Sequence, residues 1–217
     1  MGSGSLLLNA KKYAEKPEYI KYYGQELNTS TYNLARMNMF LHGISPENQN
    51  LRNGDTLDED WPTGEEIDFN MVLMNPPYSA KWSAAAGFLQ DERFSDYGVL
   101  APKSKADYAF LLHGLYHLKG NGTMAIVLPH GVLFRGAAEG KIREKLLRSG
   151  NIYAVIGLPA NLFYNTSIPT CIIVLKKQRD LLERDVLFID ASKKFNKGKK
   201  QNEMTDQHIA EVMELYS

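Results

Sequence analysis

The chain has 217 residues, of which 44% are hydrophobic, so it can bury the core of one domain and is not biased enough in composition to be disordered. Its 25 Lys and Arg balance its 25 Asp and Glu, and this neutral total argues against a nucleic-acid binder with a strongly basic surface, while a local basic face stays open. A single cysteine excludes an internal disulfide framework. No apolar stretch reaches the roughly 18 residues of a membrane span, and no signal peptide opens the chain, so we expect a cytoplasmic protein.

The first residues, Gly2-Ser3-Gly4-Ser5, have two interpretations. One is an artificial linker of the Gly/Ser kind. The other is a glycine-rich turn that leads into a helix over residues 6–16 and lets the backbone approach a nucleoside closely. The segments that follow favour the turn.

Residues 19–27 predict a strand that ends in Glu26. An acidic residue at the end of a strand that follows a glycine-rich turn and a helix is the usual partner of ribose hydroxyls. The alternative is an ordinary solvated glutamate. A short strand or loop over residues 51–57 carries a second acidic residue, Asp55, near its end.

A helix is predicted between these two segments, over residues 31–42. Its apolar residues Leu34, Met37 and Leu41 share one face, which we expect to pack inward. Gly43 follows directly and is a typical residue to end a helix.

The stretch Asn75-Pro76-Pro77-Tyr78 follows an apolar run over residues 69–74, which has the length and the Val, Leu and Met content of a buried strand. Because two prolines cannot continue a hydrogen-bonded ladder, the strand stops at Asn75. The asparagine side chain is therefore presented at the carboxyl end of a strand. In open α/β sheets this is the edge where ligands bind.

The rest of the chain alternates helices with apolar strands. An irregular stretch of about two dozen residues comes first, of a length that is usually functional. Asp107 then caps a helix that ends at Gly120-Asn121-Gly122 and has on one face Tyr108, Leu111, Leu112, Leu115 and Leu118. The remaining predicted elements are a strand over 124–128, a helix over 139–148 with Ile142 and Leu146 inward, strands over 152–158, 170–175 and 186–189, and a helix over 206–216. This alternation predicts a parallel sheet covered on both faces. The strands 152–158 and 170–175 are joined by a loop, which predicts one antiparallel excursion at an edge.

The residue types of the Asn75–Tyr78 stretch suit activation of a nucleobase amine as a nucleophile. Such an amine is a poor nucleophile because its lone pair is delocalised into the ring, and hydrogen-bond acceptors on its two hydrogens localise that pair. The amide oxygen of Asn75 and the carbonyl oxygen of Pro76 are candidate acceptors, Pro77 stiffens the turn, and Tyr78 offers a face for base stacking, worth on the order of 1–3 kcal/mol. The alternatives are a rigid turn without chemistry and a proline-rich recognition patch.

Three other features have structural interpretations that outweigh the functional ones. His113 and His117 have the spacing of a metal-binding pair on a helix, but their face is apolar and no third ligand is evident, so we predict packing and no metal. Cys171 lies in an apolar strand and is most simply a small buried hydrophobe. A lysine-rich segment either contacts phosphates or is a solvated loop; it contains Lys193, Lys194, Lys197, Lys199 and Lys200.

The chain resembles a known family over nearly its whole length. The matching segments are GSGSLLL from Gly2, YGQELNTSTYNLARMNMFLHGI from Tyr23, GDTL from Gly54, NPPYSAKWS from Asn75, DYAFLLHGLYHLKGNGTMAIVLPHGVLFRG from Asp107, GLPANLFYNTSIPTCIIVLKK from Gly157 and FIDASKKFNKGKKQN from Phe188. Together they resemble the methyltransferase (modification) subunit of type I restriction-modification systems. Members of this family are N6-adenine DNA methyltransferases that use S-adenosylmethionine and work with specificity and restriction subunits.

The resemblance implies a role for each matching position. Gly2, Ser3 and Gly4 look like part of the cofactor-binding glycine motif, Glu26 like the acid that binds the cofactor's ribose, and Asp55 like the residue that contacts its adenine. Asn75, Pro76, Pro77 and Tyr78 look like the catalytic motif, with Asn75 also beside the cofactor. Phe163 is similar in placement to the aromatic residue that packs on the opposite face of the flipped adenine, although Tyr164 is an alternative.

The resemblance also implies a Rossmann-like fold in which residues 1–217 are one partial catalytic domain, with residues 1–5 a linker or the remnant of the glycine motif and 190–217 a C-terminal extension. In the family an Asp-Pro strand and a helical domain precede the glycine motif and a further segment follows, so we expect a first strand to be missing and methyl transfer by this chain alone to be impaired. A non-catalytic scaffold fragment that binds subunits or DNA is one alternative, and an RNA or protein-glutamine methyltransferase is another. A homodimer is left open.

Overall fold

The computed structural model describes residues 1–63, 68–164, 166–180 and 184–217. They divide into two compact units, of which the first comprises Met1–Asp68 and Leu73–Asn75 and the second Phe69–Val72 and Pro76–Ser217. No helix of the described residues is both long and apolar enough to cross a membrane.

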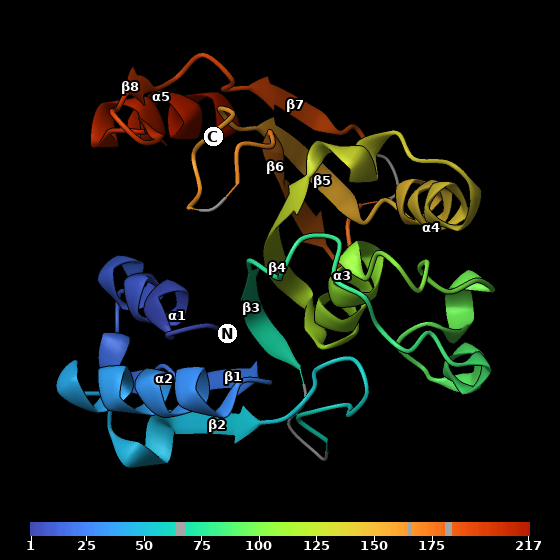
Figure 1. Cartoon of the computed structure of the whole chain (residues 1–217), viewed down its shortest axis with the longest axis horizontal. Coiled ribbons are helices and arrows are strands. Elements are labelled where there is room, and N and C mark those ends of the chain that lie inside the picture. Colours follow the sequence, from blue (N-terminus) through green and yellow to red (C-terminus); the bar gives the residue numbers. More distant parts are fainter. Residues whose placement is uncertain (64–67, 165, 181–183) are drawn as a thin grey trace. The chain divides into compact units, whose positions relative to one another are not determined.

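The first unit is built on two parallel strands, β1 (Tyr22–Glu26) and β2 (Gln49–Asn53), which pair from Tyr22 opposite Gln49 to Glu26 opposite Asn53. The helix α2 (Thr29–Leu41) connects them and packs on them, as Figure 1 shows. Its first turn is capped by the side chain of Asn28, which accepts a hydrogen bond from the backbone N–H of Thr31. A short helix, α1 (Ser5–Ala10), precedes β1. The helix predicted over residues 6–16 is therefore shorter, and residues 11–13 form a 3-10 turn.

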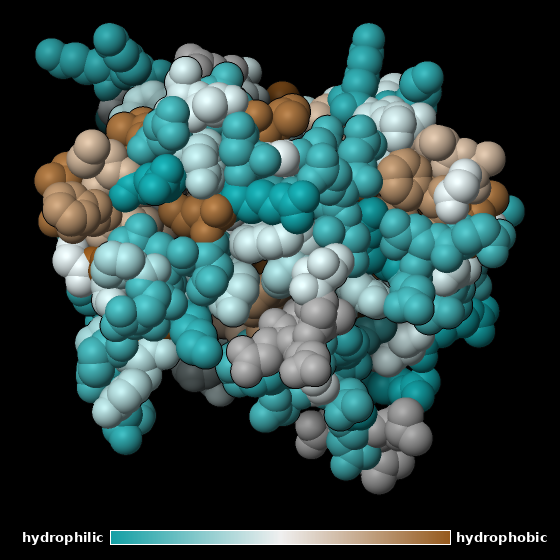
Figure 2. Space-filling model, turned by 90° about the horizontal axis from the view of Figure 1, so that it is seen from below, coloured by the Kyte–Doolittle hydropathy of each residue, from teal (hydrophilic) through white to brown (hydrophobic). Residues whose placement is uncertain are grey.

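The inward face of α2 differs from the prediction. Leu34, Met37 and Leu41 are 51%, 54% and 69% exposed, whereas Ala35 and Met39 are fully buried. The reason is close packing by the glycine turn, because a Cβ at Gly4 would lie only 3.4 Å from the Met39 side chain and 3.6 Å from that of Ala35. The helix thus buries its small and flexible side chains. The surface displayed in Figure 2 is mostly hydrophilic with separate hydrophobic patches, which is common among soluble folds.

The second unit is built on a sheet with the strand order β3-β4-β6-β5-β7 among the described residues. The strands are β3 (Phe69–Met74), β4 (Leu118–Pro129), β5 (Ile152–Gly157), β6 (Thr170–Lys176) and β7 (Leu187–Asp190). β6 is antiparallel to both β4 and β5, and β7 is parallel to β5. A reversed strand is thus confirmed, but β6 lies inside the sheet and not at its edge as predicted.

Strand β3 has the bounds that the sequence predicts, and its burial differs. It is the outermost strand in this order, so Asn70 and Met71 are exposed and the other four residues are only partly buried. The prediction of a buried strand was wrong because an apolar run does not reveal whether a second strand covers its other edge.

Three helices belong to the second unit: α3 (Asp107–Tyr116), α4 (Ala137–Arg148) and α5 (Asp206–Tyr216). The inward residues Ile142 and Leu146 of α4 are fully buried, as predicted. Helix α3 ends earlier than predicted, because Leu118 and the glycines 120 and 122 already belong to β4. Helix α5 begins and ends where predicted, and Val212 joins it to a core that includes Ala154, Ile156 and Ile189 of β5 and β7.

Candidate functional site

The glycine turn and Glu26 meet at the end of β1. Gly2 and Gly4 have φ angles of 61° and 80°, which favour glycine over any residue with a side chain. The backbone N–H of Gly2 donates a 2.9 Å hydrogen bond to Oε2 of Glu26, and that of Asn28 donates a 3.0 Å bond to Oε1. Burial opposes the charged form, but these hydrogen bonds, together with the N-terminal ammonium of Met1 at 3.3 Å from Oε2, outweigh it and lower the pKa of Glu26. Glu26 is therefore a carboxylate at neutral pH, fixed against the turn.

The other residues expected to bind the cofactor are less closely joined. Ser3 exchanges a 2.8 Å hydrogen bond with Ser5, and Asp55 accepts a 2.9 Å bond from the backbone N–H of Leu57 in its own loop. Because β1 and β2 are parallel and in register, Glu26 and Asp55 follow strand ends at the same edge of this sheet. A charged acid at a strand end, beside a glycine turn with open space over Gly2, fits the ribose of S-adenosylmethionine.

The Asn75–Tyr78 turn leaves β3 as the sequence predicts. β3 ends at Met74, Asn75 and Pro77 are exposed, Pro76 is buried and Tyr78 is half-buried. The amide of Asn75 is thus presented directly after a strand, and the buried ring of Pro76 anchors the start of the turn.

The structure brings Phe163 to Tyr78. Their ring centroids are 6.4 Å apart with 75° between the ring planes, an edge-to-face contact. Phe163 also packs against the core that contains Leu158, whereas Tyr164 is 83% exposed. Burial raises the pKa of Tyr78 to about 12, so its hydroxyl stays neutral. A base stacked on the faces of both rings would need one ring to turn, because the rings are not parallel.

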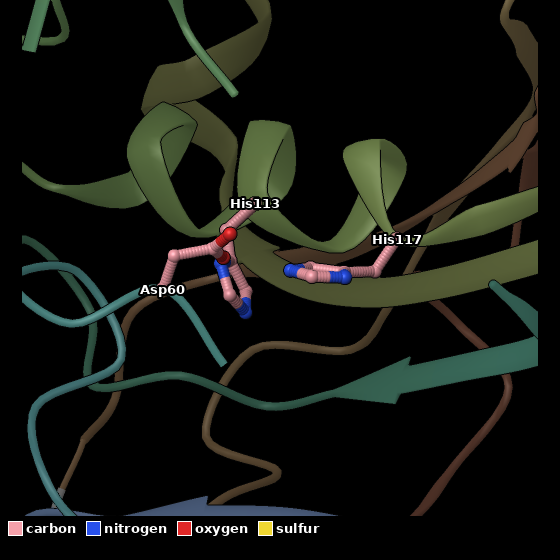
Figure 3. Close-up of side chains that lie close together, drawn as sticks. All are labelled: Asp60, His113 and His117. Carbon is pink, nitrogen blue, oxygen red and sulfur yellow. The ribbon is translucent and has the colours of Figure 1, made fainter. Parts of the chain in front are cut away.

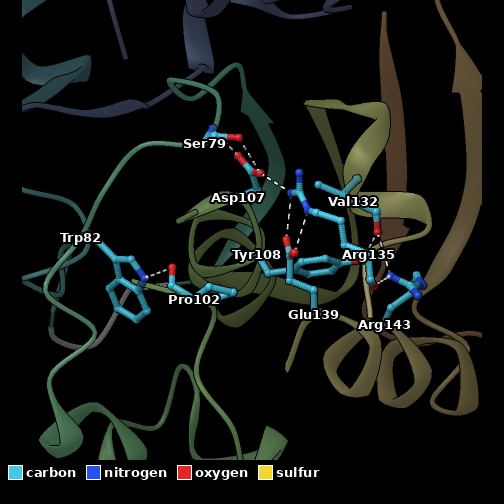
Figure 4. A network of polar contacts seen from close by, with 9 residues as sticks. All are labelled: Ser79, Trp82, Pro102, Asp107, Tyr108, Val132, Arg135, Glu139 and Arg143. Atoms are coloured by element: carbon cyan, nitrogen blue, oxygen red, sulfur yellow. Dashed lines mark hydrogen bonds and ion pairs between the residues drawn. The ribbon is translucent and has the colours of Figure 1, made fainter. Parts of the chain in front are cut away.

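A buried carboxylate holds the turn that follows Tyr78. Ser79 has a φ of 51°, and its backbone N–H donates a 2.7 Å hydrogen bond to Oδ1 of Asp107, which is fully buried (Figure 4). The sequence predicted Asp107 as the cap of α3. The prediction was wrong: Ala106 is the N-cap residue without a side-chain bond, and Asp107 is the first helical residue. Its side chain stabilises a left-handed residue in the loop that carries Tyr78.

Arg135 neutralises this carboxylate. Its Nη2 donates to Oδ2 of Asp107 at 2.6 Å and to Oε1 of Glu139 at 2.8 Å, and its Nε donates to Oε2 of Glu139 at 2.6 Å. The hydrogen bonds that Arg135 donates to Glu139, helped by the one to Asp107, raise the pKa of Arg135 against the effect of burial. Sequence reasoning missed this network (Figure 4). The spacing of Arg135 and Glu139 by four residues was the available signal, although nothing local pairs them with Asp107.

The two histidines and the cysteine lie where packing predicts. His113, in the last turn of α3, and His117, which directly follows the helix, are 7% and 1% exposed, with ring centroids 4.8 Å apart (Figure 3). Nδ1 of His113 lies 3.2 Å from Nη1 of the buried Arg93, and burial holds the pKa of His113 well below its usual value. Cys171 is fully buried, and burial raises its pKa to about 12. These are properties of core side chains.

Comparison with known proteins identifies the family. The family model described as N-6 DNA Methylase matches residues 1–217. The chain is 45% identical over 226 aligned residues to the type I restriction enzyme MpnII methylase subunit of Mycoplasma pneumoniae, covering all of this chain and 41% of that protein. It is 28% identical over 206 residues to the EcoKI methylase subunit of Escherichia coli, covering 90% of this chain and 37% of that protein.

A solved structure agrees with these relatives. The methyltransferase subunit of a type I restriction-modification system from Streptococcus thermophilus matches with a TM-score of 0.97 and 70% identity, covering 100% of this chain and 46% of that one. The crystal structure of the EcoKI M protein matches with a TM-score of 0.73 at 22% identity, which supports the Rossmann-like fold. The chain thus spans less than half the length of the relatives it matches. With a family match over its full extent, the chain belongs to the N-6 DNA methylase family.

Proposed function

We propose that this chain carries the chemistry that transfers a methyl group from S-adenosylmethionine to the N6 amine of adenine in DNA, within a type I restriction-modification system. The observation that carries the proposal is the Asn75–Tyr78 turn, which leaves β3 with Tyr78 in ring contact with Phe163. Membership of the N-6 DNA methylase family supports the choice of DNA over RNA or protein.

The first unit supplies the residues that would hold the cofactor. S-adenosylmethionine supplies an electrophilic methyl group when it is bound. Gly2 and Gly4 let the backbone approach it closely. Glu26 would accept a hydrogen bond from its ribose through the lone pair of Oε1 that Asn28 leaves free, because Oε2 accepts from both Gly2 and the N-terminal ammonium of Met1. Ser3 and Asp55 complete the proposed set, with Asp55 toward the adenine of the cofactor.

Asn75 and Pro76 supply the acceptors for the target amine. The amide oxygen of Asn75 and the carbonyl oxygen of Pro76 each accept one N6 hydrogen, which localises the lone pair on nitrogen. The nitrogen would then attack the methyl carbon in line with its bond to sulfur, so that the N–C bond forms as the C–S bond breaks. The thioether leaves with that electron pair, the amine loses a proton, and no covalent bond to the protein forms. Positioning and these dipoles provide most of the rate enhancement. Pro77 stiffens the turn so that both oxygens keep their direction.

Tyr78 and Phe163 hold the adenine after it leaves the duplex. Extruding a base costs a few kcal/mol, and stacking on an aromatic face returns on the order of 1–3 kcal/mol. Phe163 is favoured over Tyr164 because it already contacts Tyr78. The proposed partners are DNA and the specificity and restriction subunits, and the proposed location is the cytoplasm; a homodimer is a further proposal for the assembly.

Tritiated methyl transfer to DNA, RNA and protein tests the function. The assay uses the longest native polypeptide that contains these residues, together with its specificity and restriction subunits. We expect incorporation into DNA alone, recovered as N6-methyladenine, and a loss on the order of 10²-fold in Asn75→Ala, comparable to removing one transition-state hydrogen bond elsewhere. Incorporation into RNA or protein instead of DNA, or full activity of Asn75→Ala, would contradict the proposal. A scaffold without activity would incorporate nothing.

A further inference from the structure

We propose that the hairpin of strands β8 (Asn196–Lys197) and β9 (Asn202–Glu203) is a DNA-phosphate-binding arm, fastened to the loop that carries Phe163, so that binding of the DNA backbone stabilises the placement of the target base. We call residues 193–203 the lysine arm. The inference rests on the proposed function and assigns a second contact to DNA, distinct from the base-contacting residues Tyr78 and Phe163.

The charge of the lysine arm is concentrated and largely uncompensated. It contains five lysines and one acidic residue, Glu203, in a chain whose total charge is zero. Lys194 pairs with Glu211 of α5. The other four lysines are exposed, and none of them has an ion pair with any described residue; they are Lys193, Lys197, Lys199 and Lys200. A cluster of this kind attracts a polyanion.

The hairpin holds two of these lysines at a tight tip. β8 and β9 are antiparallel, with Asn196 opposite Glu203 and Lys197 opposite Asn202. A Cβ at Gly198 would lie 2.3 Å from the carbonyl oxygen of Gln201, so only glycine fits this turn. The chain therefore reverses tightly at Gly198, and the turn presents the exposed side chains of Lys199 and Lys200 next to each other.

Two asparagines fasten the lysine arm to the Phe163 loop. The backbone N–H of Asn202 donates to the carbonyl of Asn161 at 2.8 Å, and its side-chain Nδ2 donates to the carbonyl of Ala160 at 2.8 Å. Nδ2 of Asn161 in turn donates to the carbonyl of Lys200 at 3.4 Å. Asn161 adopts a φ of 53°, which these bonds stabilise.

The fastened loop leads directly to the aromatic pair. Phe163 follows Asn161 by two residues, and Met204, next to the lysine arm, packs against the same core cluster as Phe163. Phe163 contacts Tyr78. A phosphate bound at the tip would therefore restrict the loop whose aromatic ring holds the base. The arm would bind any sequence equally, because phosphate contacts carry no base information.

The salt dependence of DNA binding measures this contact. Each phosphate neutralised on duplex DNA adds about 0.9 to the slope of log affinity against log salt concentration. The double variant Lys199→Gln/Lys200→Gln should therefore reduce that slope by about 1 to 2. The matched control is Lys119→Gln/Lys141→Gln, which removes the same charge from two exposed lysines outside the lysine arm and should leave the slope unchanged.

The experiment uses the longest native polypeptide with its partner subunits and a duplex that carries 2-aminopurine at the target adenine. Fluorescence anisotropy over a range of salt concentrations gives the slope, and 2-aminopurine emission reports the extruded base. Asn202→Ala, which keeps every lysine and cuts the bond to Ala160, should retain the slope and weaken the emission change.

The outcomes separate this inference from the proposed function. If the wild type methylates DNA but Lys199→Gln/Lys200→Gln gives the same slope as the control Lys119→Gln/Lys141→Gln, the lysine arm does not bind phosphate. An unchanged emission signal in Asn202→Ala would show that the arm and the base-contacting loop are not coupled. If the wild type neither binds nor methylates DNA, the proposed function fails and the inference fails with it. A reduced slope in the lysine variant alone, with weaker emission in Asn202→Ala, supports both parts.

Discussion

Replacing Arg135 by methionine removes the cation that serves two buried carboxylates. Asp107 is 0% and Glu139 is 3% exposed, and Arg135→Met leaves both without their partner. Breaking a buried ion pair by removing one member typically costs about 3–5 kcal/mol. Because the Arg135 side chain is 19% exposed, water can reach part of the site, and we expect a value near the lower limit, about 3 kcal/mol. Urea denaturation of wild type and variant measures the difference in the free energy of unfolding.

The chain contains a matched control for this variant. Arg148 and Glu144 form another ion pair at a spacing of four residues, with side chains that are 78% and 61% exposed. Exposed pairs of this kind contribute at most about 1 kcal/mol, so Arg148→Met should change the free energy of unfolding by less than that. Equal losses in Arg135→Met and Arg148→Met would refute the reasoning from burial.

A rescue distinguishes lost charge balance from lost packing. The triple variant Arg135→Met/Asp107→Asn/Glu139→Gln removes both buried carboxylate charges along with the guanidinium and keeps an acceptor for the backbone N–H of Ser79. It should recover a large part of the stability lost in Arg135→Met, because neutral polar groups cost less to bury than charges. Failure to recover any stability would mean that the methylene groups of Arg135 matter more than its charge.

Three further predictions concern single side chains. Phe163→Ala should lower kcat/KM for DNA methylation by about 10- to 100-fold, the loss expected from one stacking contact. Tyr164→Ala should change kcat/KM by less than about 3-fold. Equal losses in the two variants would contradict the choice of Phe163 as the aromatic residue that holds the base. Burial raises the pKa of Tyr108 from 10.0 to about 12, so the unfolded chain loses this proton first and stability should fall between pH 10 and 12. Chemical denaturation across that range should show a shallower decline in Tyr108→Phe, and an identical decline would refute this linkage. Cys171, with a pKa raised to about 12 by burial, should resist iodoacetamide at pH 8 in the folded protein and react after unfolding, which mass spectrometry detects; rapid modification of the folded form would contradict its burial.

Local signals in the sequence were sufficient for several elements. The bounds of β3 follow from an apolar run closed by two prolines, and the helix predicted over residues 206–216 has the bounds of α5. The position of Asn75 at a strand end was predictable for the same reason. These features depend on neighbouring residues alone, so no knowledge of the tertiary structure was needed.

Features that depend on distant residues were not predictable. Asp107 looked like a helix cap because its partners, Ser79 and Arg135, each lie 28 residues away. The face of α2 was misassigned because Gly4, far from it in sequence, packs against Ala35 and Met39. In each case the pattern alone was compatible with two structures, and a contact between distant segments selected one.

The position of β6 affects how this family can change. Since β6 runs against β5, the connection from Gly157 to Thr170 joins adjacent ends of two neighbouring strands as a hairpin, closed by a 2.9 Å hydrogen bond from the N–H of Leu158 to the carbonyl of Thr170. A crossover helix would have to keep its length to span the sheet, whereas a hairpin loop can gain or lose residues at little cost in closure entropy. Insertions and deletions that alter the surroundings of a target base can therefore accumulate beside Phe163 while the strand register on either side is preserved.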